Sequence, residues 1–305
     1  MKIGIVGAGA LGLYYGALLQ RGGQEVRFLL RRDHDAIRDQ GLRVTSPAGD
    51  FHLEQVQGFR DPAAMGQVDL VLVGLKTFAN PHLAELIEPL LGPKTCILTL
   101  QNGLGNEELL ARLFGAERVL GGIAFLCSNR GAPGVVHHLD QGRIRLGEFR
   151  GGHSLRAATL AETFRQAGLE CEAVADLCKA RWEKLVWNIP FNGLCALTGA
   201  TTAELLAHGP SRAQVRALMD EVVAAANAQG LSAPIDAGFA ERMLRVTEGM
   251  GPYRPSMMID RQEGRPLELE AIYAIPLARA KDKGVEMVRV RLLHALLEVG
   301  EKTRD

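Results

Sequence analysis

Three polar residues recur at every fourth position in the stretch ARWEKLVWNIPFNGLCALTG, namely Lys184, Asn188 and Asn192. Residues four apart share one face of an α-helix, so a lysine and two amides would line one surface. The neighbours of the lysine are aromatic or aliphatic, and a desolvated lysine delivers its proton more readily near neutral pH. This face could therefore orient a polar substrate and protonate it, although a solvated polar stripe has the same spacing. Pro190 is expected to kink or loosen the helix.

The stretch PSMMIDRQEGRPLELEAI adds further polar candidates, namely Ser256, Glu268 and Glu270. The two glutamates are two positions apart, so a helix cannot point both in the same direction. At most one of them is expected to share a site with Lys184.

A glycine-rich turn follows the apolar stretch IGIV and precedes a helical pattern, which is the context that a dinucleotide-binding fingerprint requires. Gly7 permits the tight turn, Gly9 lets the backbone approach a pyrophosphate, and Gly12 lets the helix lie close to the strand. The N–H groups at the start of the helix would then face the phosphate charge. A glycine turn that serves packing alone is the alternative. The predicted cofactor-binding turn comprises Gly7, Ala8, Gly9, Ala10, Leu11 and Gly12.

Two arginines, Arg31 and Arg32, follow the second predicted strand, EVRFLL. An acidic residue in this region binds the ribose hydroxyl of NAD, and Glu25 lies at the wrong end of the strand to do so. A guanidinium at the carboxyl end can instead pair with a 2′-phosphate through two hydrogen bonds. The pattern favours NADPH, with Arg31 ahead of Arg32 as the ligand. A solvated basic strand end is the alternative.

Two more polar residues end buried strands. Lys76 follows DLVLVGL, and Asn102 follows CILTLQ. Ligands of open α/β sheets bind at the carboxyl ends of strands, so both residues are candidates for contacting nicotinamide ribose or an anionic substrate. Each taken alone is also typical of a solvated loop.

The elements that must position these residues alternate between strand and helix up to about residue 174. This alternation predicts a mostly parallel sheet with helices on both faces. GVVHHLD and RIRLGE are expected to be two antiparallel strands separated by Gln141 and Gly142. Helical spacing dominates afterwards. The sequence therefore predicts an N-terminal Rossmann-type NADP-binding domain, residues 1–174, and an all-helical substrate and catalytic domain, residues 175–305.

The amino-acid composition argues against several classes of function. Among 305 residues the formal net charge is zero, which argues against a general binder of nucleic acid or acidic lipid. The five cysteines are widely spaced and odd in number, so reduced thiols are expected rather than disulfides or a metal site. No leader or membrane-spanning stretch is evident. We expect a cytoplasmic protein.

Together these residues resemble the ketopantoate reductase family (2-dehydropantoate 2-reductases). The resemblance runs through the whole chain. It is carried by the glycine turn, Arg31, Lys76 in GLK, Asn102 in QNG, Lys184 in WEKLVWN, and the SMMxD…E pattern of Ser256, Asp260 and Glu268.

The resemblance implies a binding role for three residues of the first domain. Arg31 would hold the 2′-phosphate of NADPH. Lys76 and Asn102 would contact the cofactor or substrate near the nicotinamide. The family pairs a Rossmann domain with a helical one and places its site in the cleft between them.

The resemblance also implies a catalytic set, in which Lys184 would donate a proton to the ketone oxygen of a 2-keto acid. Asn188 and Asn192 would orient that substrate, and Ser256 would bind its polar end. Glu268 would bind a substrate hydroxyl or the lysine. The implied reaction is reduction of 2-dehydropantoate to pantoate, in pantothenate biosynthesis.

Two alternatives stay open at this point. A related NADP-dependent dehydrogenase could act on another hydroxy acid or on a polyol phosphate, and a phosphate would need a basic cluster. The candidates for that cluster are Arg242, Arg245, Arg254, Arg261 and Arg265. A non-catalytic NADP(H)-binding sensor would bind the nucleotide without turnover. A homodimer is also open, because helical second domains often mediate dimers.

Overall fold

The structure is a computed structural model that describes residues 1–302. The chain forms two compact units. The sheet unit comprises residues 1–101 and 106–177, and the helical unit comprises residues 102–105 and the chain from residue 178 onward.

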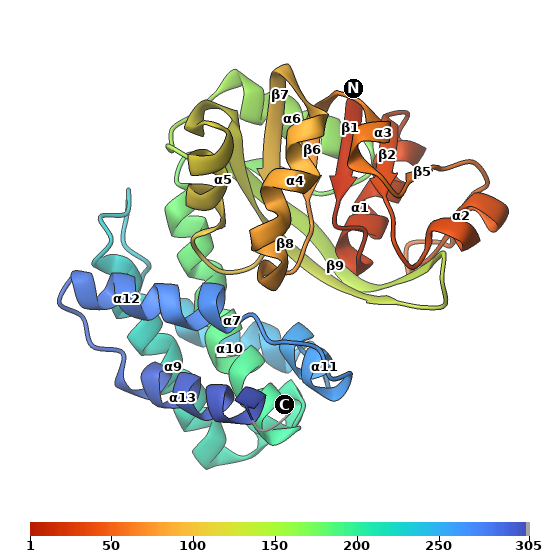
Figure 1. Ribbon diagram of the computed structural model, residues 1–305. Coiled ribbons are helices and arrows are strands. Elements are labelled where there is room, and N and C mark those ends of the chain that lie inside the picture. Colours follow the sequence, from red (N-terminus) through yellow and green to blue (C-terminus); the bar gives the residue numbers. More distant parts are fainter. Residues whose placement is uncertain (303–305) are drawn as a thin grey trace. The chain divides into compact units, whose positions relative to one another are not determined.

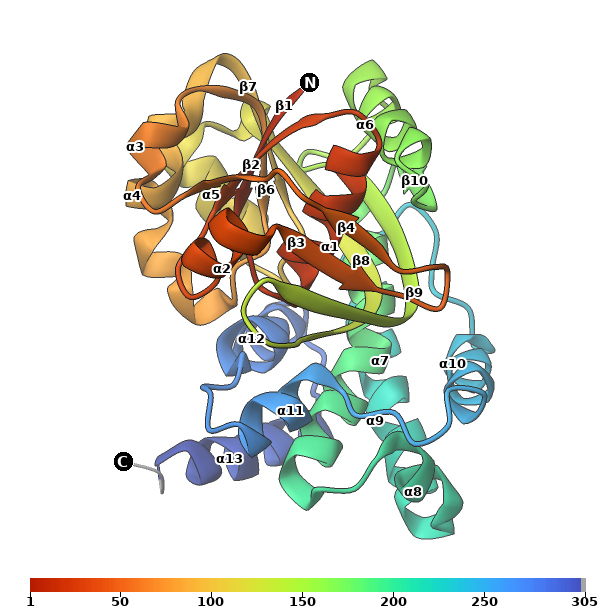
Figure 2. The same cartoon turned by 90° about the vertical axis from the view of Figure 1, so that its right-hand side faces the viewer.

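Ten strands of the sheet unit form one mixed sheet (Figures 1 and 2). The strands are β1 (Lys2–Val6), β2 (Glu25–Leu29), β3 (Leu42–Thr45), β4 (Phe51–Leu53), β5 (Gln57–Phe59), β6 (Val68–Val73), β7 (Leu91–Thr99), β8 (Val119–Arg130), β9 (Val135–Glu148) and β10 (Cys171–Ala173). Six neighbours in the order β5-β2-β1-β6-β7-β8 run parallel. This is the strand order of dinucleotide-binding sheets, and its direction of winding reverses between β1 and β6.

Helices cover both faces of this sheet. One core joins α1 and α6 to side chains such as Ile5 and Leu72, and the other joins α3, α4 and α5 to side chains such as Val71 and Val73. Successive residues of one strand thus serve opposite cores, which explains the unbroken apolar runs in the sequence. The helical segments of this unit are α1 (Ala10–Arg21), α2 (His34–Gln40), α3 (Pro62–Met65), η1 (Thr77–His82), α4 (Leu83–Ile87), η2 (Glu88–Leu90), α5 (Asn106–Phe114), η3 (Ala116–Arg118) and α6 (Leu155–Gln166).

The prediction of two strands separated by Gln141 and Gly142 is wrong. Residues 135–148 form the single strand β9, which pairs antiparallel with β8. Gln141 and Gly142 have positive φ angles of 63° and 130°, and the pairing register skips Gly142, so these residues form a β-bulge. Glycine at positive φ serves a bulge as well as a hairpin turn, and local sequence does not distinguish the two.

An ion pair anchors the loop after β2 to the hairpin between β8 and β9. The buried carboxylate of Asp33 binds the guanidinium of Arg130 and accepts a hydrogen bond from the backbone N–H of Gly134 at 3.1 Å. Residues about a hundred positions apart are thereby joined. This contact fixes the backbone next to Arg31 and Arg32.

The helical unit forms its own core around side chains such as Trp182, Phe191 and Met219. Its helices are α7 (Leu177–Thr198), α8 (Thr202–Ala207), α9 (Gly209–Asn227), α10 (Phe239–Glu248), α11 (Ser256–Gln262), the π-helix η4 (Glu270–Ala274), α12 (Ile275–Asp282) and α13 (Val288–Lys302) (Figure 1). A mixed sheet with helices on both faces, followed by helices, confirms the predicted fold class.

Helix α7 runs unbroken although Pro190 lies inside it. The hydroxyl of Tyr273 donates a hydrogen bond to the carbonyl oxygen of Ile189 at 2.8 Å, and complete burial raises the pKa of that phenol well above its ordinary value. A Cβ on Gly193 would lie 2.5 Å from the same hydroxyl oxygen, so glycine is what admits the tyrosine. The π-helix that carries Tyr273 therefore supports α7 where proline weakens it.

The cysteines and the apolar character of the helices were the remaining features considered from composition. The five cysteines all lie within residues 1–302, and the structure contains no bond between any two of them. In the same range, every helix is too short or too polar to cross a membrane.

We expect Asp33→Ala to lower the free energy of unfolding by about 1.5–3 kcal/mol, the range for hydrogen bonds to a charged group. The side chain of Arg130 is 32% exposed, so water can replace part of the lost contact. Asp35→Ala is the matched control, because Asp35 lies two residues further on and is 58% exposed. It should change stability little. Chemical denaturation measures both variants, and equal effects would contradict the anchoring role of Asp33.

Candidate functional site

The glycine turn after β1 contains two glycines that the fold itself requires. Gly7 has a φ of +105°, and a Cβ there would lie 2.4 Å from the backbone nitrogen of Leu75. A Cβ on Gly12 would lie 2.2 Å from the carbonyl oxygen of Gly7. Gly9 differs, since a Cβ there would meet no atom within 4 Å. The packing inside the protein does not explain Gly9, whereas close approach of a ligand to its backbone does.

Helix α1 begins at Ala10, directly after Gly9. Its first turn has no capping side chain and no acidic residue. The N–H groups of a first helical turn lack intrahelical acceptors, and the helix dipole adds positive potential there. The turn from Gly7 through Ala8, Leu11 and Gly12 thus fits the pyrophosphate of a dinucleotide.

In the structure, the two arginines after β2 differ in their contacts. Arg32 donates a hydrogen bond to the carbonyl oxygen of Gly131 at 2.8 Å, so it is engaged with the β8–β9 hairpin. Arg31 is exposed, and its guanidinium makes no hydrogen bond or ion pair within residues 1–302. Glu25 lies at the opposite end of β2 and pairs with Arg27. Arg31 is therefore the arginine available to a 2′-phosphate.

Lys76 is half-buried and immediately precedes η1, three residues after β6 ends. A buried network holds this loop. Gln101 donates to the side-chain oxygen of Asn80 at 2.8 Å, and Asn80 donates to that of Asn106 at 3.1 Å. Thr99 adds a hydrogen bond to Gln101 at 3.0 Å. Sequence reasoning missed this network, although LQNGLGN contains two of its members.

Asn102 belongs to the helical unit by its contacts. In the same segment, the N–H of Leu104 donates to the carbonyl oxygen of Ala271, in the π-helix, at 2.9 Å. Gly103 has a φ of +81°, and a Cβ there would lie 2.3 Å from that oxygen. The glycine of QNG is thus required where the segment meets the π-helix. This contact places the segment that contains Asn102 against the π-helix, which begins at Glu270, two residues after Glu268.

Helix α7 supplies Lys184, Asn188 and Asn192, as the spacing predicted. Lys184 is half-buried, and its neighbours Trp182 and Leu185 are buried. Asn188 is only 3% exposed, and its Nδ2 has no hydrogen-bond partner within residues 1–302. A buried amide donor without an acceptor is uncommon and points to a ligand atom.

Asn192 has partners inside the protein. Its side-chain oxygen accepts hydrogen bonds from the backbone N–H of Met257 at 3.1 Å and from the hydroxyl of Ser256 at 3.4 Å. Helix α11 has Pro255 at its N-cap and no capping side chain of its own, so Asn192 caps it from α7. The structure thus brings Asn192 and Ser256 together.

Glu268 and Glu270 differ in burial, as expected of residues two apart. Glu268 is 2% exposed, and its carbonyl oxygen accepts from the N–H of Ile272 at 3.2 Å, whereas Glu270 is exposed. Asp260, of the SMMxD pattern, pairs with Arg265 at 2.8 Å. Of the two glutamates, Glu268 is therefore the buried one.

The basic cluster considered for a phosphate substrate is largely occupied. Arg242 pairs with Asp236, and Arg265 pairs with Asp260. Arg261 donates to two carbonyl oxygens near the end of α13. Within residues 1–302, no three side chains of the metal-ligating types come together as a metal site.

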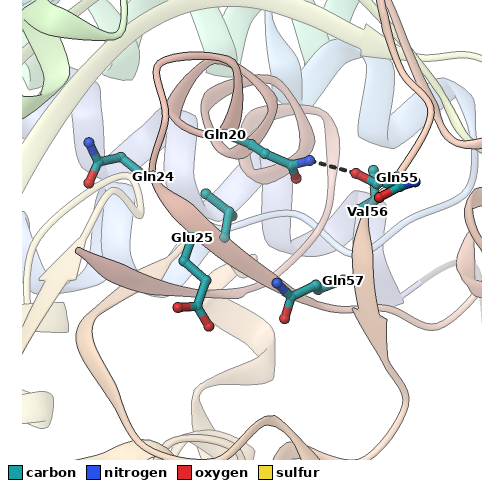
Figure 3. A pocket seen from close by; sticks show the side chains of 7 residues that line it. Gln20, Gln24, Glu25, Gln55, Val56 and Gln57 are labelled. Carbon is teal, nitrogen blue, oxygen red and sulfur yellow. Dashed lines mark hydrogen bonds between the residues drawn. The ribbon is translucent and has the colours of Figure 1, made fainter.

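A hollow of about 360 Å³ lies at the amino ends of β2 and β5 (Figure 3). In it, Gln20 donates a hydrogen bond to the carbonyl oxygen of Gln55 at 2.6 Å. This hollow is at the opposite end of the parallel strands from Gly7. Ligands of open α/β sheets bind at the carboxyl ends, so the hollow is separate from the candidate site. The residues labelled around it are Gln20, Gln24, Glu25, Gln55, Val56 and Gln57.

Comparison with known proteins gives a consistent result. The family model described as ketopantoate reductase PanE/ApbA matches residues 3–151, and the model of its C-terminal part matches residues 176–301. A crystal structure of 2-dehydropantoate 2-reductase from Geobacter metallireducens is 60% identical, with a TM-score of 0.97 over 98% of this chain and 99% of that one.

Two further proteins extend the comparison. A 2-dehydropantoate 2-reductase from Nostoc sp. is 44% identical, over 97% of this chain and 94% of that protein. The crystal structure of the enzyme of that name from Methylococcus capsulatus is 32% identical with a TM-score of 0.90, over 100% of this chain and 98% of that one. These matches confirm the resemblance seen in the sequence. The chain therefore belongs to the ketopantoate reductase family.

Proposed function

We propose that the chain catalyses the NADPH-dependent reduction of 2-dehydropantoate to pantoate, a step of pantothenate biosynthesis. Relatives that match along nearly the whole chain are named 2-dehydropantoate 2-reductases, which supports this substrate. The predicted division into a cofactor-binding domain, residues 1–174, and a substrate domain, residues 175–305, is part of the proposal. The reduced thiols of a cytoplasmic protein fit it as well.

The polar face of α7 is the observation that carries the reaction class. It presents a half-buried lysine and, one turn later, a buried amide whose Nδ2 has no acceptor within residues 1–302. Reduction of a ketone makes the carbonyl oxygen increasingly negative. A hydrogen-bond donor and a cation on one face suit that developing charge.

Lys184 has two tasks in the proposed mechanism. Its ammonium stabilises the developing alkoxide and then transfers a proton from Nζ to the former ketone oxygen. Bound NADPH supplies the hydride that reduces the carbonyl carbon. Hydride on carbon and proton on oxygen together give the 2-hydroxy acid.

Four side chains of the helical unit are assigned to the substrate or to its positioning. Asn188 donates from Nδ2 to an oxygen of the keto acid. Asn192, whose oxygen is used by Met257 and Ser256, positions Ser256 for the polar end of the substrate. Glu268 accepts a hydrogen bond from the substrate hydroxyl or from Lys184.

The cofactor contacts divide between backbone and side chains. The turn from Gly7 to Gly12 binds the pyrophosphate through N–H groups at the start of α1. Arg31 binds the 2′-phosphate, and Lys76 and Asn102 bind near the nicotinamide. The network of Thr99, Gln101, Asn80 and Asn106 keeps the Lys76 loop in place.

The alternative functions have less support. A polyol-phosphate substrate needs unpaired arginines, yet Arg242 and Arg265 are paired with carboxylates. A non-catalytic NADP(H) sensor would not need a substrate, so this hypothesis does not explain why Nδ2 of Asn188 is buried without an acceptor within residues 1–302.

A direct assay of NADPH oxidation tests the proposal and its alternatives together. Purified protein is given NADPH with 2-dehydropantoate, other 2-keto acids or a keto-polyol phosphate, and absorbance is followed. The largest kcat/KM is expected with 2-dehydropantoate. A preference for the phosphate would favour the related dehydrogenase, and nucleotide binding without any turnover would favour the sensor.

We expect Lys184→Ala to lower kcat by about 100-fold or more, because general acid catalysis contributes about 10²–10⁴-fold and charge stabilisation about 10²–10³-fold. The dissociation constant for NADPH, measured by fluorescence titration, should stay within a few-fold. Lys281→Ala, at an exposed position of α12, controls for loss of a surface lysine. Unchanged kcat in the Lys184 variant would exclude it as the proton donor.

We expect Arg31→Ala to raise KM for NADPH by about 10- to 100-fold, since a charge-assisted bond contributes about 1.5–3 kcal/mol. KM for NADH should change little, because NADH lacks the 2′-phosphate. Arg32→Ala is the matched control, and a much smaller effect is expected, since Arg32 is bonded to Gly131. An equal loss with both cofactors would show that Arg31 acts on the fold instead.

A further inference from the structure

Two kinds of side chain flank Lys184 on helix α7. At about 100° per residue, Asn188 and Asn192 lie about 40° and about 80° from Lys184 in one direction around the helix axis. Trp187 and Phe191 lie about 60° and about 20° from it in the other direction. The lysine thus lies between a strip of two amides and a strip of two aromatic rings.

The two rings of the aromatic strip differ in burial. Phe191 is completely buried in the core of the helical unit, whereas Trp187 is half-buried and packs against that core. The centroid of the Trp187 ring lies 5.1 Å from that of Phe191 and 6.0 Å from that of Tyr253. Trp187 is therefore the member of the strip that keeps part of its surface exposed.

A hydrogen bond fixes the orientation of the Trp187 indole. Its Nε1–H donates to the hydroxyl oxygen of Thr247 at 2.9 Å, and that hydroxyl donates to the carbonyl oxygen of Met243 at 2.7 Å. Thr247 is fully buried on α10. Because the polar atom of the indole is satisfied inside the protein, the exposed part of the ring offers a ligand apolar surface.

The next residue along the helix offers the opposite chemistry. Asn188 is 3% exposed, and its Nδ2 has no hydrogen-bond partner within residues 1–302. A donor without an acceptor and a fixed apolar ring thus lie on either side of Lys184. A ligand that suits both has an oxygen acceptor next to a bulky apolar carbon. A 2-keto acid that is branched at the carbon beside the ketone has this structure.

We propose that Trp187 selects substrates with a branched carbon beside the ketone, and that Thr247 is the positioning residue for its indole. This inference rests on the proposed function, since 2-dehydropantoate carries two methyl groups on that carbon. The methyl groups pack against the indole while an oxygen of the keto acid accepts a hydrogen bond from Asn188. One methylene group in an apolar pocket changes discrimination between substrates by about 10- to 200-fold.

A comparison of two substrates tests the role of Trp187. 2-Dehydropantoate and 4-hydroxy-2-oxobutanoate differ only in the two methyl groups, and kcat/KM is measured for each at saturating NADPH. The wild-type chain is expected to prefer 2-dehydropantoate. Trp187→Ala should lower the ratio of the two kcat/KM values by about 10-fold or more, with the loss mainly on 2-dehydropantoate.

Phe239→Ala is the matched control for loss of an aromatic side chain. Phe239 is also a half-buried ring that packs against the core of the helical unit, but it lies at the opposite end of α10 from Thr247. The ratio of the two kcat/KM values should stay at the wild-type level in this variant. Thermal melting shows that each variant is folded.

Conservative changes test the hydrogen bond between Trp187 and Thr247. Trp187→Phe keeps an aromatic surface, so its ratio should stay closer to wild type than that of Trp187→Ala. Thr247→Val removes the acceptor of Nε1 at nearly constant volume and should lower the ratio. Added to Trp187→Phe, the same change should have no further effect, because the N–H that it serves is already absent.

The possible results separate this inference from the proposed function. An unchanged ratio in Trp187→Ala, or an equal loss of kcat/KM with both substrates, would overturn the role of Trp187 alone. So would a wild-type chain that reduces both substrates equally well. An equal effect of Thr247→Val with and without Trp187→Phe would overturn the positioning role of Thr247. A wild-type chain that does not reduce 2-dehydropantoate would overturn the proposed function and this inference with it.

Discussion

The close approach of two backbones at the end of β1 is the constraint on which the sheet unit's part of the candidate site depends. A Cβ on Gly12 would lie 2.2 Å from the carbonyl oxygen of Gly7, so α1 can begin with three residues between it and the end of β1 only because these positions are glycine. That start directs the unpaired N–H groups of α1 toward the open side of Gly9. The same geometry that packs the helix thus forms the turn proposed to bind the pyrophosphate.

Buried polar groups impose the second constraint, since each needs a hydrogen-bond partner once water is excluded. The side chain of Gln101 donates a hydrogen bond to that of Asn80, and this bond helps to fix the loop that begins at Lys76. In the helical unit, the backbone N–H of Leu104 donates a hydrogen bond to the carbonyl oxygen of Ala271. Polar contacts therefore help to hold the loops at the ends of β6 and β7.

The features of the fold that depend on local pattern could be predicted from the sequence. Unbroken apolar runs indicated buried parallel strands, and GAGALG between a strand and a helix indicated the nucleotide turn. Features that depend on distant partners could not. Gln141 and Gly142 have the composition of a hairpin turn but form a bulge, because β8 pairs along the whole of β9. The bond between Gln101 and Asn80 likewise joins loops that local spacing does not relate.

The two asparagines of α7 show where sequence reasoning about a site stops. Their spacing places Asn188 and Asn192 on the same face, with no difference between them. In the structure, the oxygen of Asn192 caps α11, whereas Nδ2 of Asn188 is buried without a partner within residues 1–302. An unsatisfied buried donor costs about 1–3 kcal/mol, and such a cost is expected where a ligand completes the bond. The incomplete contact, rather than the well-formed one, is therefore the stronger indication of where substrate binds.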